Sequence, residues 1–396
     1  MVKKVFTRSE KTARVPLPQG FSTIWVTVAL DLVGFGIVVP ILGRYAERFG
    51  ASGLEVGLLF ASFSLAQLVC APLLGRLSDR IGRKPVIMIS LLGTAVGSFV
   101  TGAAGTLWVL FLGRILDGAS GASVAVAQGA VTDLAPPSER PRLLGLLGAA
   151  FGVGFVVGPA LGGLASLGGE HLPFFVAGTV ALINAGVAWV RLPETRPARV
   201  RNEARMQSSQ GSGAKIRLWG LALTGFTAIV AFSGFEATFS LLAGNRFNLT
   251  EGGIAAIFVG IGALLVVVQG ILIAPINAKL GTQRSLQIGL VLNSVGLIIL
   301  AFAESWSILI IALALLTVGQ GLVAPNLSTL VSGRVPDHRR GEALGFQQGV
   351  NAIGRVSGPA LAGVLYDHVS IGSPYLVGGA LCALALLFAV GVGEQE

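Results

Sequence analysis

GLLGAAFGVGFVVGPALGGLA at residues 145–165 is an apolar, glycine-rich stretch. The same pattern returns 200 residues later as GFQQGVNAIGRVSGPALAGVL at residues 345–365. The shared Gly-Pro-Ala-Leu occupies residues 158–161 and 358–361. A helix needs about 20 apolar residues to cross roughly 30 Å of hydrocarbon, so each stretch is long enough to span a membrane. The repeat predicts a chain built from two homologous halves.

Composition extends this prediction to the whole chain. Of the 396 residues, 53% are apolar and only 12% are charged, and the mean hydropathy is +0.79. A soluble domain of this size needs more charge to cover its surface, so we predict an all-α membrane protein with twelve transmembrane helices in two homologous six-helix halves. We expect the spans near 22–43, 54–76, 85–104, 107–130, 142–167, 172–192, 218–243, 252–278, 284–303, 306–332, 340–366 and 371–393.

The remaining segments complete the domain organisation. Residues 1–21 form an N-terminal tail, 22–192 the first half, 193–217 a linker, 218–393 the second half, and 394–396 the C-terminal end. The linker is basic and then Ser/Gly/Gln-rich, a composition that predicts a flexible segment lying against anionic lipid.

The distribution of basic residues predicts the orientation. With an even number of spans, the tail, the linker and every second loop lie on one side of the membrane, and these segments hold 23 of the 28 Lys and Arg residues. The loops on the opposite side hold only Arg44, Arg48 and Arg246. The positive-inside rule then predicts a multi-pass protein of the cell (inner) membrane with both termini on the cytoplasmic side. It also accounts for the net charge of +9 without a nucleic-acid partner. The tail lacks an apolar core, so we expect the first span to direct insertion and no cleaved signal peptide.

The loop after the second span, GRLSDRIGRKP at residues 75–85, places one acidic and four basic residues close together between the ends of two helices. An Asp at a helix end can pair with a neighbouring Arg, and such a contact breaks when two halves rock. The alternative is a plain basic turn that obeys the positive-inside rule. We predict a conformational latch made of Gly75, Asp79, Arg80, Gly82 and Arg83.

The fifth span carries small residues beside a proline. Small residues on one stripe allow close helix approach, and proline bends the helix because it removes a backbone donor. The stripe consists of Gly154, Gly158, Pro159, Gly162 and Gly163.

Ionisable residues inside spans are costly, so each is a functional candidate. They are Asp31, Arg114, Asp117, Glu236 and Arg355. Asp31 has no base in its own span, and a carboxylate in a low dielectric can load and release protons. Arg114 and Asp117 lie three residues apart, so a purely structural pair is the alternative for them. For Glu236 the alternative is a satisfied acid at a cavity rim, and for Arg355 a structural ion pair.

Helical spacing places several of these side chains on polar faces. Arg114, Asp117, Gly121 and Gln128 share a face of the fourth span, and Glu236 and Ser240 a face of the seventh. A substrate path is expected between the two halves near the midplane. We expect it to be lined by Asp31, Gln128, Glu236, Ser240, Gln320 and Asn326. Cys70 and Cys382 fall in apolar runs and the three histidines in loops, so no metal site is predicted.

These motifs resemble those of the major facilitator superfamily. The 75–85 loop is similar to its motif A, and the Gly-Pro stripe to the antiporter motif of the twelve-helix drug:proton antiporters. Leu110, Arg114 and Gly118 resemble motif B, in which the Arg is implicated in proton coupling. RILDGASG at 114–121 and LPFF at 172–175 are similar to tetracycline and multidrug efflux proteins.

The resemblance implies a proton-coupled antiporter that exports small, apolar or amphiphilic molecules, with antibiotic resistance as a consequence. Its proton-coupling residues would be Asp31, Arg114, Asp117 and Glu236. The proton gradient would supply the energy without a cofactor, and the protein would work as a monomer in the lipid membrane. Acids of the third and ninth spans of tetracycline exporters are replaced here by Gly97 and Asn293, which argues against tetracycline itself. The alternatives are a proton-coupled transporter of another cargo, such as a lipid-like molecule, sugar or nutrient, and a membrane-embedded enzyme. No clustered His, Cys or Asp motif supports the enzyme.

Overall fold

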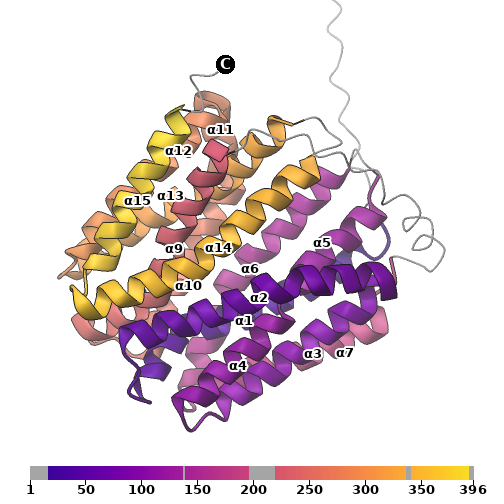
Figure 1. Ribbon diagram of the computed structural model, residues 1–396, viewed down its shortest axis with the longest axis horizontal. Coiled ribbons are helices and arrows are strands. Elements are labelled where there is room, and N and C mark those ends of the chain that lie inside the picture. Colours follow the sequence, from indigo (N-terminus) through magenta and orange to yellow (C-terminus); the bar gives the residue numbers. More distant parts are fainter. Residues whose placement is uncertain (1–16, 137–138, 196–218, 336–339, 392–396) are drawn as a thin grey trace, which may run out of the picture.

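A computed structural model describes residues 17–136, 139–195, 219–335 and 340–391, and in these ranges every regular element is a helix (Figure 1). Most of the expected tail 1–21, most of the linker 193–217 and all of the end 394–396 lie outside the described residues.

The helices follow the expected spans in order. In the first half they are α1 (Phe21–Glu47), α2 (Gly53–Ile81), α3 (Arg83–Gly102), α4 (Leu107–Ser120), α5 (Ser123–Leu134), α6 (Arg140–Ser166) and α7 (Leu172–Arg191). In the second half they are α9 (Trp219–Phe247), α10 (Glu251–Val267), η1 (Val268–Leu272), α11 (Ile273–Leu280), α12 (Thr282–Ala301), α13 (Trp306–Gly333), α14 (Arg340–His368) and α15 (Ser373–Gly391).

The described helices form twelve spans. Eleven of them are long and apolar enough to cross a membrane. The twelfth, α14, has 29 residues but is more polar, since it carries Gln347, Asn351 and Arg355. The expected all-α membrane fold is confirmed.

Two spans are interrupted in ways that periodicity did not predict. The fourth is split into α4 and α5 at Gly121 and Ala122, because the backbone of Gly121 leaves the helical region (ψ 40°). The eighth passes through the π-helical turn η1. Glycine is a poor helix former, and π turns inside helices are often found at functional sites. The continuous face expected from Arg114 to Gln128 is therefore broken at Gly121.

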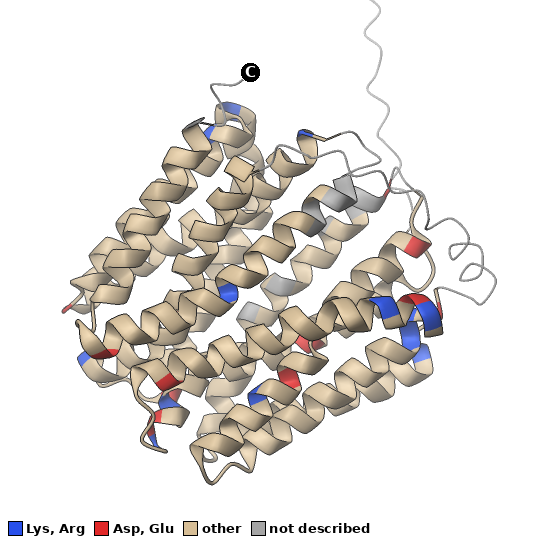
Figure 2. Ribbon diagram, viewed as in Figure 1, with Lys and Arg blue, Asp and Glu red and all other residues tan. Residues whose placement is uncertain are grey.

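The bundle has two ends, which we name after one arginine each. The Arg48 end carries the turns after α1, α3, α6, α9, α12 and α14, and the Arg83 end carries the turns after α2, α5 and α11. Charged residues gather at both ends of the ribbon, and few lie between them (Figure 2). This distribution is expected where the middle of the bundle is surrounded by hydrocarbon.

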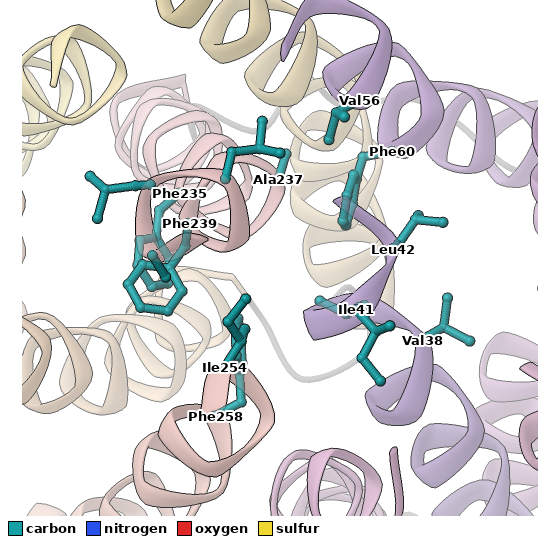
Figure 3. Packing of buried hydrophobic residues seen from close by; sticks show 14 of the residues in the cluster. Val38, Ile41, Leu42, Val56, Phe60, Phe235, Ala237, Phe239, Ile254 and Phe258 are labelled. Carbon is teal, nitrogen blue, oxygen red and sulfur yellow. The ribbon is translucent and has the colours of Figure 1, made fainter. Parts of the chain in front are cut away.

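The apolar core shows that the halves meet at the Arg48 end. There, one buried cluster contains residues of both halves, among them Ile41, Phe60, Phe239 and Phe258 from α1, α2, α9 and α10 (Figure 3). Towards the Arg83 end the buried residues form two clusters, one within each half. Among the described residues, no buried cluster joins the halves at the Arg83 end.

Glycines bring helix backbones together along the same plan in both halves. In the first half, a Cβ on Gly158 would lie 2.6 Å from the Cα of Gly36, so α6 contacts α1 backbone to backbone. Gly163 then faces Ala255 of α10 across the seam between the halves. Its repeat partner Gly363, on α14, faces Leu54 of α2 across the second seam. The repeat in the sequence thus corresponds to two equivalent contacts between the halves.

Candidate functional site

Asp31 lies midway along α1 and is held by a hydroxyl group. The Oγ of Ser123, the first residue of α5, donates a hydrogen bond of 2.5 Å to Oδ2 of Asp31. In the described part of the chain, no Lys or Arg forms an ion pair with Asp31. Asp117 of α4 is the acid that acts on it electrostatically. Ser123 was not among the sequence candidates.

Arg114 and Asp117 form the buried pair that was the structural alternative for them. Nη1 of Arg114 donates to Oδ2 of Asp117 at 2.7 Å, and their side chains are 3% and 12% exposed. The guanidinium also lies over the ring of Phe63 from α2, 4.3 Å from its centroid. A buried pair of this kind is costly to break on one side, so the two residues are expected to act together.

Glu236 of α9 and Arg355 of α14 form the opposite-charge pair of the second half. Each acts electrostatically on the other, although no direct hydrogen bond joins them. Arg355 is exposed although it lies in the middle of its helix. A charge at this depth does not face lipid without large cost, so its electrostatic partner Glu236 is what stabilises it here.

The other residues expected in the cavity are not gathered at one place. Gln128 is exposed on α5, and the Oε1 of Gln320 accepts from Asn293 at 3.2 Å. Two expectations do not hold in this conformation. Ser240 is buried against α1 in the contact between the halves, and Asn326 is buried inside the second half, where it accepts from Asn277 at 2.7 Å. Helical periodicity identifies a polar face but not what that face contacts.

The expected latch residues lie at the Arg83 end. Arg83 is paired with Asp79 at 3.0 Å and with Asp133 of α5 at 2.9 Å, and it also donates to the hydroxyl of Ser78 at 2.7 Å. Its own backbone N–H donates to Glu194 at 2.9 Å. The guanidinium therefore ties the start of α3 to the ends of α2 and α5.

Other motif A residues take separate positions. Gly82 has φ 112°, in the left-handed region that favours glycine, and a Cβ there would clash with Glu194. Arg80 is exposed, and Gly75 lies in open space within α2. The sequence did not predict Asp133 or Glu194, which lie 50 and 111 residues from Arg83.

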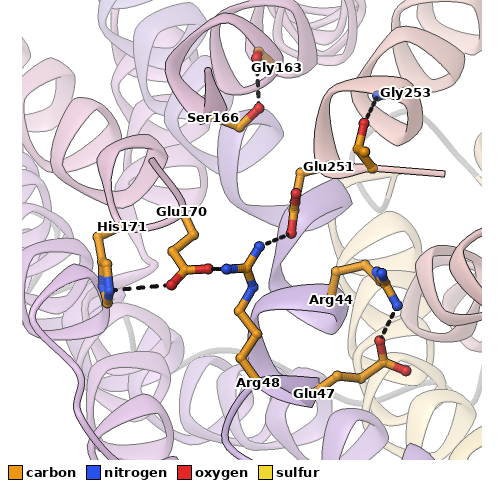
Figure 4. A network of polar contacts seen from close by, with 10 residues as sticks. Arg44, Glu47, Arg48, Gly163, Ser166, Glu170, His171, Glu251 and Gly253 are labelled. Atoms are coloured by element: carbon orange, nitrogen blue, oxygen red, sulfur yellow. Dashed lines mark hydrogen bonds and ion pairs between the residues drawn. The ribbon is translucent and has the colours of Figure 1, made fainter. Parts of the chain in front are cut away.

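A polar network closes the Arg48 end (Figure 4). Arg48, after α1, is paired with Glu251 at the start of α10 at 2.7 Å, and with Glu170 before α7. His171 lies beside Glu170 and forms a 2.7 Å hydrogen bond with the hydroxyl of Tyr45. A loop histidine to which the sequence assigned no role thus belongs to this network.

A second contact between the halves lies nearby. The carboxylate of Asp367, near the end of α14, accepts from the backbone N–H groups of Gly53 and Leu54 at 2.8 and 2.6 Å. The contact of Arg48 with Glu251 and those of Asp367 with Gly53 and Leu54 thus join the two halves at the Arg48 end.

No group of three or more His, Cys, Asp or Glu side chains in the described ranges is arranged to hold a metal ion, and Cys70 and Cys382 are free thiols. The arrangement is that of mid-span charges between two halves that contact each other at one end.

Comparison with known proteins agrees with this arrangement. The profile of the Major Facilitator Superfamily matches residues 24–288 and 270–394. The tetracycline resistance protein, class B, of Escherichia coli is 31% identical over 352 residues, with 87% of each chain covered. Multidrug resistance protein 2 of Bacillus subtilis (strain 168) is 27% identical over 374 residues, covering 92% of this chain and 93% of that protein.

Solved structures have the same fold. The human organic anion transporter MFSD10 (TETRAN) superposes with a TM-score of 0.72 at 25% identity, covering 93% of this chain and 98% of that one. A bacterial homolog of the human lysosomal transporter Spinster, in an inward-facing and occupied conformation, gives a TM-score of 0.78 at 14% identity, covering 95% and 96%. The second likeness concerns the fold alone.

Proposed function

The chain belongs to the Major Facilitator Superfamily, and from that premise we propose that it is a proton-coupled antiporter that exports small, largely apolar molecules by alternating access. Similarity to tetracycline and multidrug resistance proteins over nearly the whole chain supports export of this cargo class. The observation that carries the proton coupling is Asp31, a carboxylate at mid-span that is held by a hydroxyl group and not by a cation.

The positive-inside rule supports a cytoplasmic Arg83 end, and a shared buried cluster at the Arg48 end supports a conformation in which cargo reaches the halves from the cytoplasm. Cargo enters between the halves from the inside while Asp31 releases its proton. Opening of the Arg48 end exchanges cargo for a proton from outside. Each proton that moves inward contributes roughly 2.3 kcal/mol per 100 mV of membrane potential. Arg114 and Asp117 are neighbours of Asp31 in this scheme, and Glu236 with Arg355 is the corresponding charged pair of the second half.

A second candidate is a proton-coupled transporter of another cargo, such as a lipid-like molecule, a sugar or a nutrient. The exposed Arg355 favours a cargo with an anionic group within this class. The similar human structure is named an organic anion transporter, which agrees with such a cargo.

The test begins with a susceptibility panel of apolar antibiotics and dyes in an efflux-deficient host, with and without a protonophore. Export predicts resistance that the protonophore removes.

A fluorescent dye chosen from the panel is then followed in everted vesicles energised by a pH gradient. Asp31→Asn should abolish its gradient-driven transport while the purified variant still binds the dye. Wild-type transport by Asp31→Asn would show that Asp31 is structural and would move the assignment to Glu236, which Glu236→Gln tests. Uptake of an anionic solute that Arg355→Ala abolishes, without resistance in the panel, would select the second candidate.

A further inference from the structure

We propose that Ser123 is a positioning residue for Asp31, and that the break in the fourth span exists to bring the Ser123 hydroxyl to that carboxylate. This inference rests on the proposed proton-coupled function and adds a residue and a structural device to it.

The break is held in place from α2. Gln67, in the middle of α2, donates from Nε2 to the carbonyl of Gly121 at 2.7 Å, so the carbonyl at the break has a partner. One turn earlier, Gly118 lies so close to Phe63 of α2 that a Cβ would come within 2.9 Å of the Phe63 Cα. A buried carbonyl without a partner is costly, so Gln67 stabilises the broken form of the span over a continuous helix.

The break turns Ser123 into the first residue of a new helix. An α-helix has free N–H groups and a partial positive charge at its start, and both favour a nearby anion. Ser123 is 4% exposed, and its hydroxyl donates to the Asp31 carboxylate at 2.5 Å. In a continuous fourth span, the backbone around Ser123 would have no free N–H groups and no such partial charge.

The other charges around Asp31 leave this hydroxyl as its direct partner. Asp117 on α4 acts on Asp31 as a like charge, and Arg114 on the same helix neutralises Asp117 at 2.7 Å. Among the described residues of α2, α5, α6, α7, α9 and α10, which pack against α1, no further ionisable side chain acts on Asp31. The Ser123 hydrogen bond therefore favours the ionised carboxylate in the conformation described here.

This arrangement links the proton to the conformation. With the Ser123 hydroxyl in place, Asp31 gives up its proton towards the Arg83 end. A movement of α5 away from α1 removes the hydrogen bond and leaves the carboxylate in a low dielectric, where it binds a proton. Ser123 thus sets the pH at which the exchange occurs, and it need not touch the cargo.

The experiment follows the protonation of Asp31 without any cargo. Wild-type protein in liposomes is titrated with pH while infrared spectra record the carbonyl stretch of protonated carboxyls, and the band that Asp31→Asn removes is assigned to Asp31. Ser123→Ala should move the midpoint of this band to higher pH by about one pH unit, because a hydrogen bond to a charged group is lost. The pH profile of dye efflux should move in the same direction.

Matched variants separate this role from a structural one. Ser90→Ala is the control, since Ser90 is a fully buried serine of α3 whose hydroxyl has no hydrogen-bond partner, and it should leave the midpoint unchanged. Ser123→Thr should keep the wild-type midpoint and Ser123→Val should move it, and these two side chains are nearly equal in volume. If Ser123→Ala does not fold, the comparison of Ser123→Thr with Ser123→Val still tests the role of the hydroxyl group.

The outcomes are distinct for the two proposals. An Asp31 band with the same midpoint in wild type, Ser123→Ala and Ser123→Val overturns the role of Ser123 and leaves proton coupling through Asp31 intact. Gradient-driven efflux that survives Asp31→Asn overturns the proposed function itself.

Discussion

Asp367 of the second half caps the start of α2 in the first half, with its carboxylate 2.6 Å from the backbone nitrogen of Leu54. The same carboxylate accepts from Gly53 at 2.8 Å. The repeat partner of Asp367 at an offset of 200 residues is Leu167, whose side chain cannot accept a hydrogen bond. Two seams that are equivalent in their glycine packing therefore differ in their polar contacts.

We expect Asp367→Asn to favour opening of the Arg48 end. Hydrogen bonds to a charged acceptor contribute about 1.5–3 kcal/mol, so the closed population should fall roughly tenfold relative to the open one. Distances between spin labels on Leu167→Cys and Glu304→Cys, one in each half and both exposed, report this opening when Cys70 and Cys382 are replaced by alanine.

The control for this measurement is Glu55→Gln. Glu55 belongs to the capping box of Ser52 within the first half, so this change removes an acid from the same end without touching the second half. An equal lengthening in both variants would mean that the loss of charge, and not the cap between the halves, causes the opening.

At the Arg83 end, we expect Arg83→Lys to abolish net transport. The guanidinium uses Nε for Asp133 and Nη1 for Asp79 and Ser78, and one ammonium group cannot reproduce this fork. Dye binding by the purified variant should remain close to wild type, because these residues lie at the end of the bundle and not between the halves.

Asp79→Asn tests the same latch from its acidic side and should give the same loss of transport with binding retained. Arg76→Lys is the matched control, since Arg76 is exposed near the same end of α2 and is not one of the predicted latch residues. A parallel loss of dye affinity in the Asp79 and Arg83 variants would identify a direct cargo contact and contradict the latch.

Gly158→Ala should destabilise the first half. The added Cβ would lie 2.6 Å from the Cα of Gly36, and overpacking of this kind typically costs about 1–3 kcal/mol. Thermal unfolding followed by tryptophan fluorescence should show a lower midpoint. Gly148→Ala, on the same helix but with open space around it, should leave the midpoint unchanged or raise it. Equal midpoints for the two variants would refute the backbone contact as a source of stability.

The orientation remains a prediction that reporter fusions can check. Fusions at Ser209 and at Glu396 should both give a cytoplasmic signal, because 23 basic residues lie on that side. A periplasmic signal from either fusion would overturn the orientation and the even number of spans together.

The sequence was sufficient for the spans, the two halves and the pairing alternative for Arg114 and Asp117, because each depends on residues close in the chain or on a repeat. It was insufficient for Ser123, Asp133 and Asp367, whose partners lie 92, 50 and more than 300 residues away. The glycine at 121, a poor helix former in the middle of the fourth span, was the available signal for the break. Nothing in the local pattern distinguished Asn326, buried within its half, from a residue facing the cargo.

The division of the apolar core into one shared cluster and two separate ones has a consequence for biosynthesis. The cluster around Leu91 and Val126 needs only the first half, so it can form while the ribosome is still synthesising the second. The shared cluster of Ile41, Phe60 and Phe239 begins to form only after α9 has entered the bilayer, and Tyr375 and Cys382 of α15 complete it. The N–H groups of Gly53 and Leu54 gain their acceptor only when α14 arrives. Assembly therefore ends at the Arg48 end. A chain truncated before α14 should insert and keep a folded first half, but its two halves should lack the contact that Asp367 makes at that end.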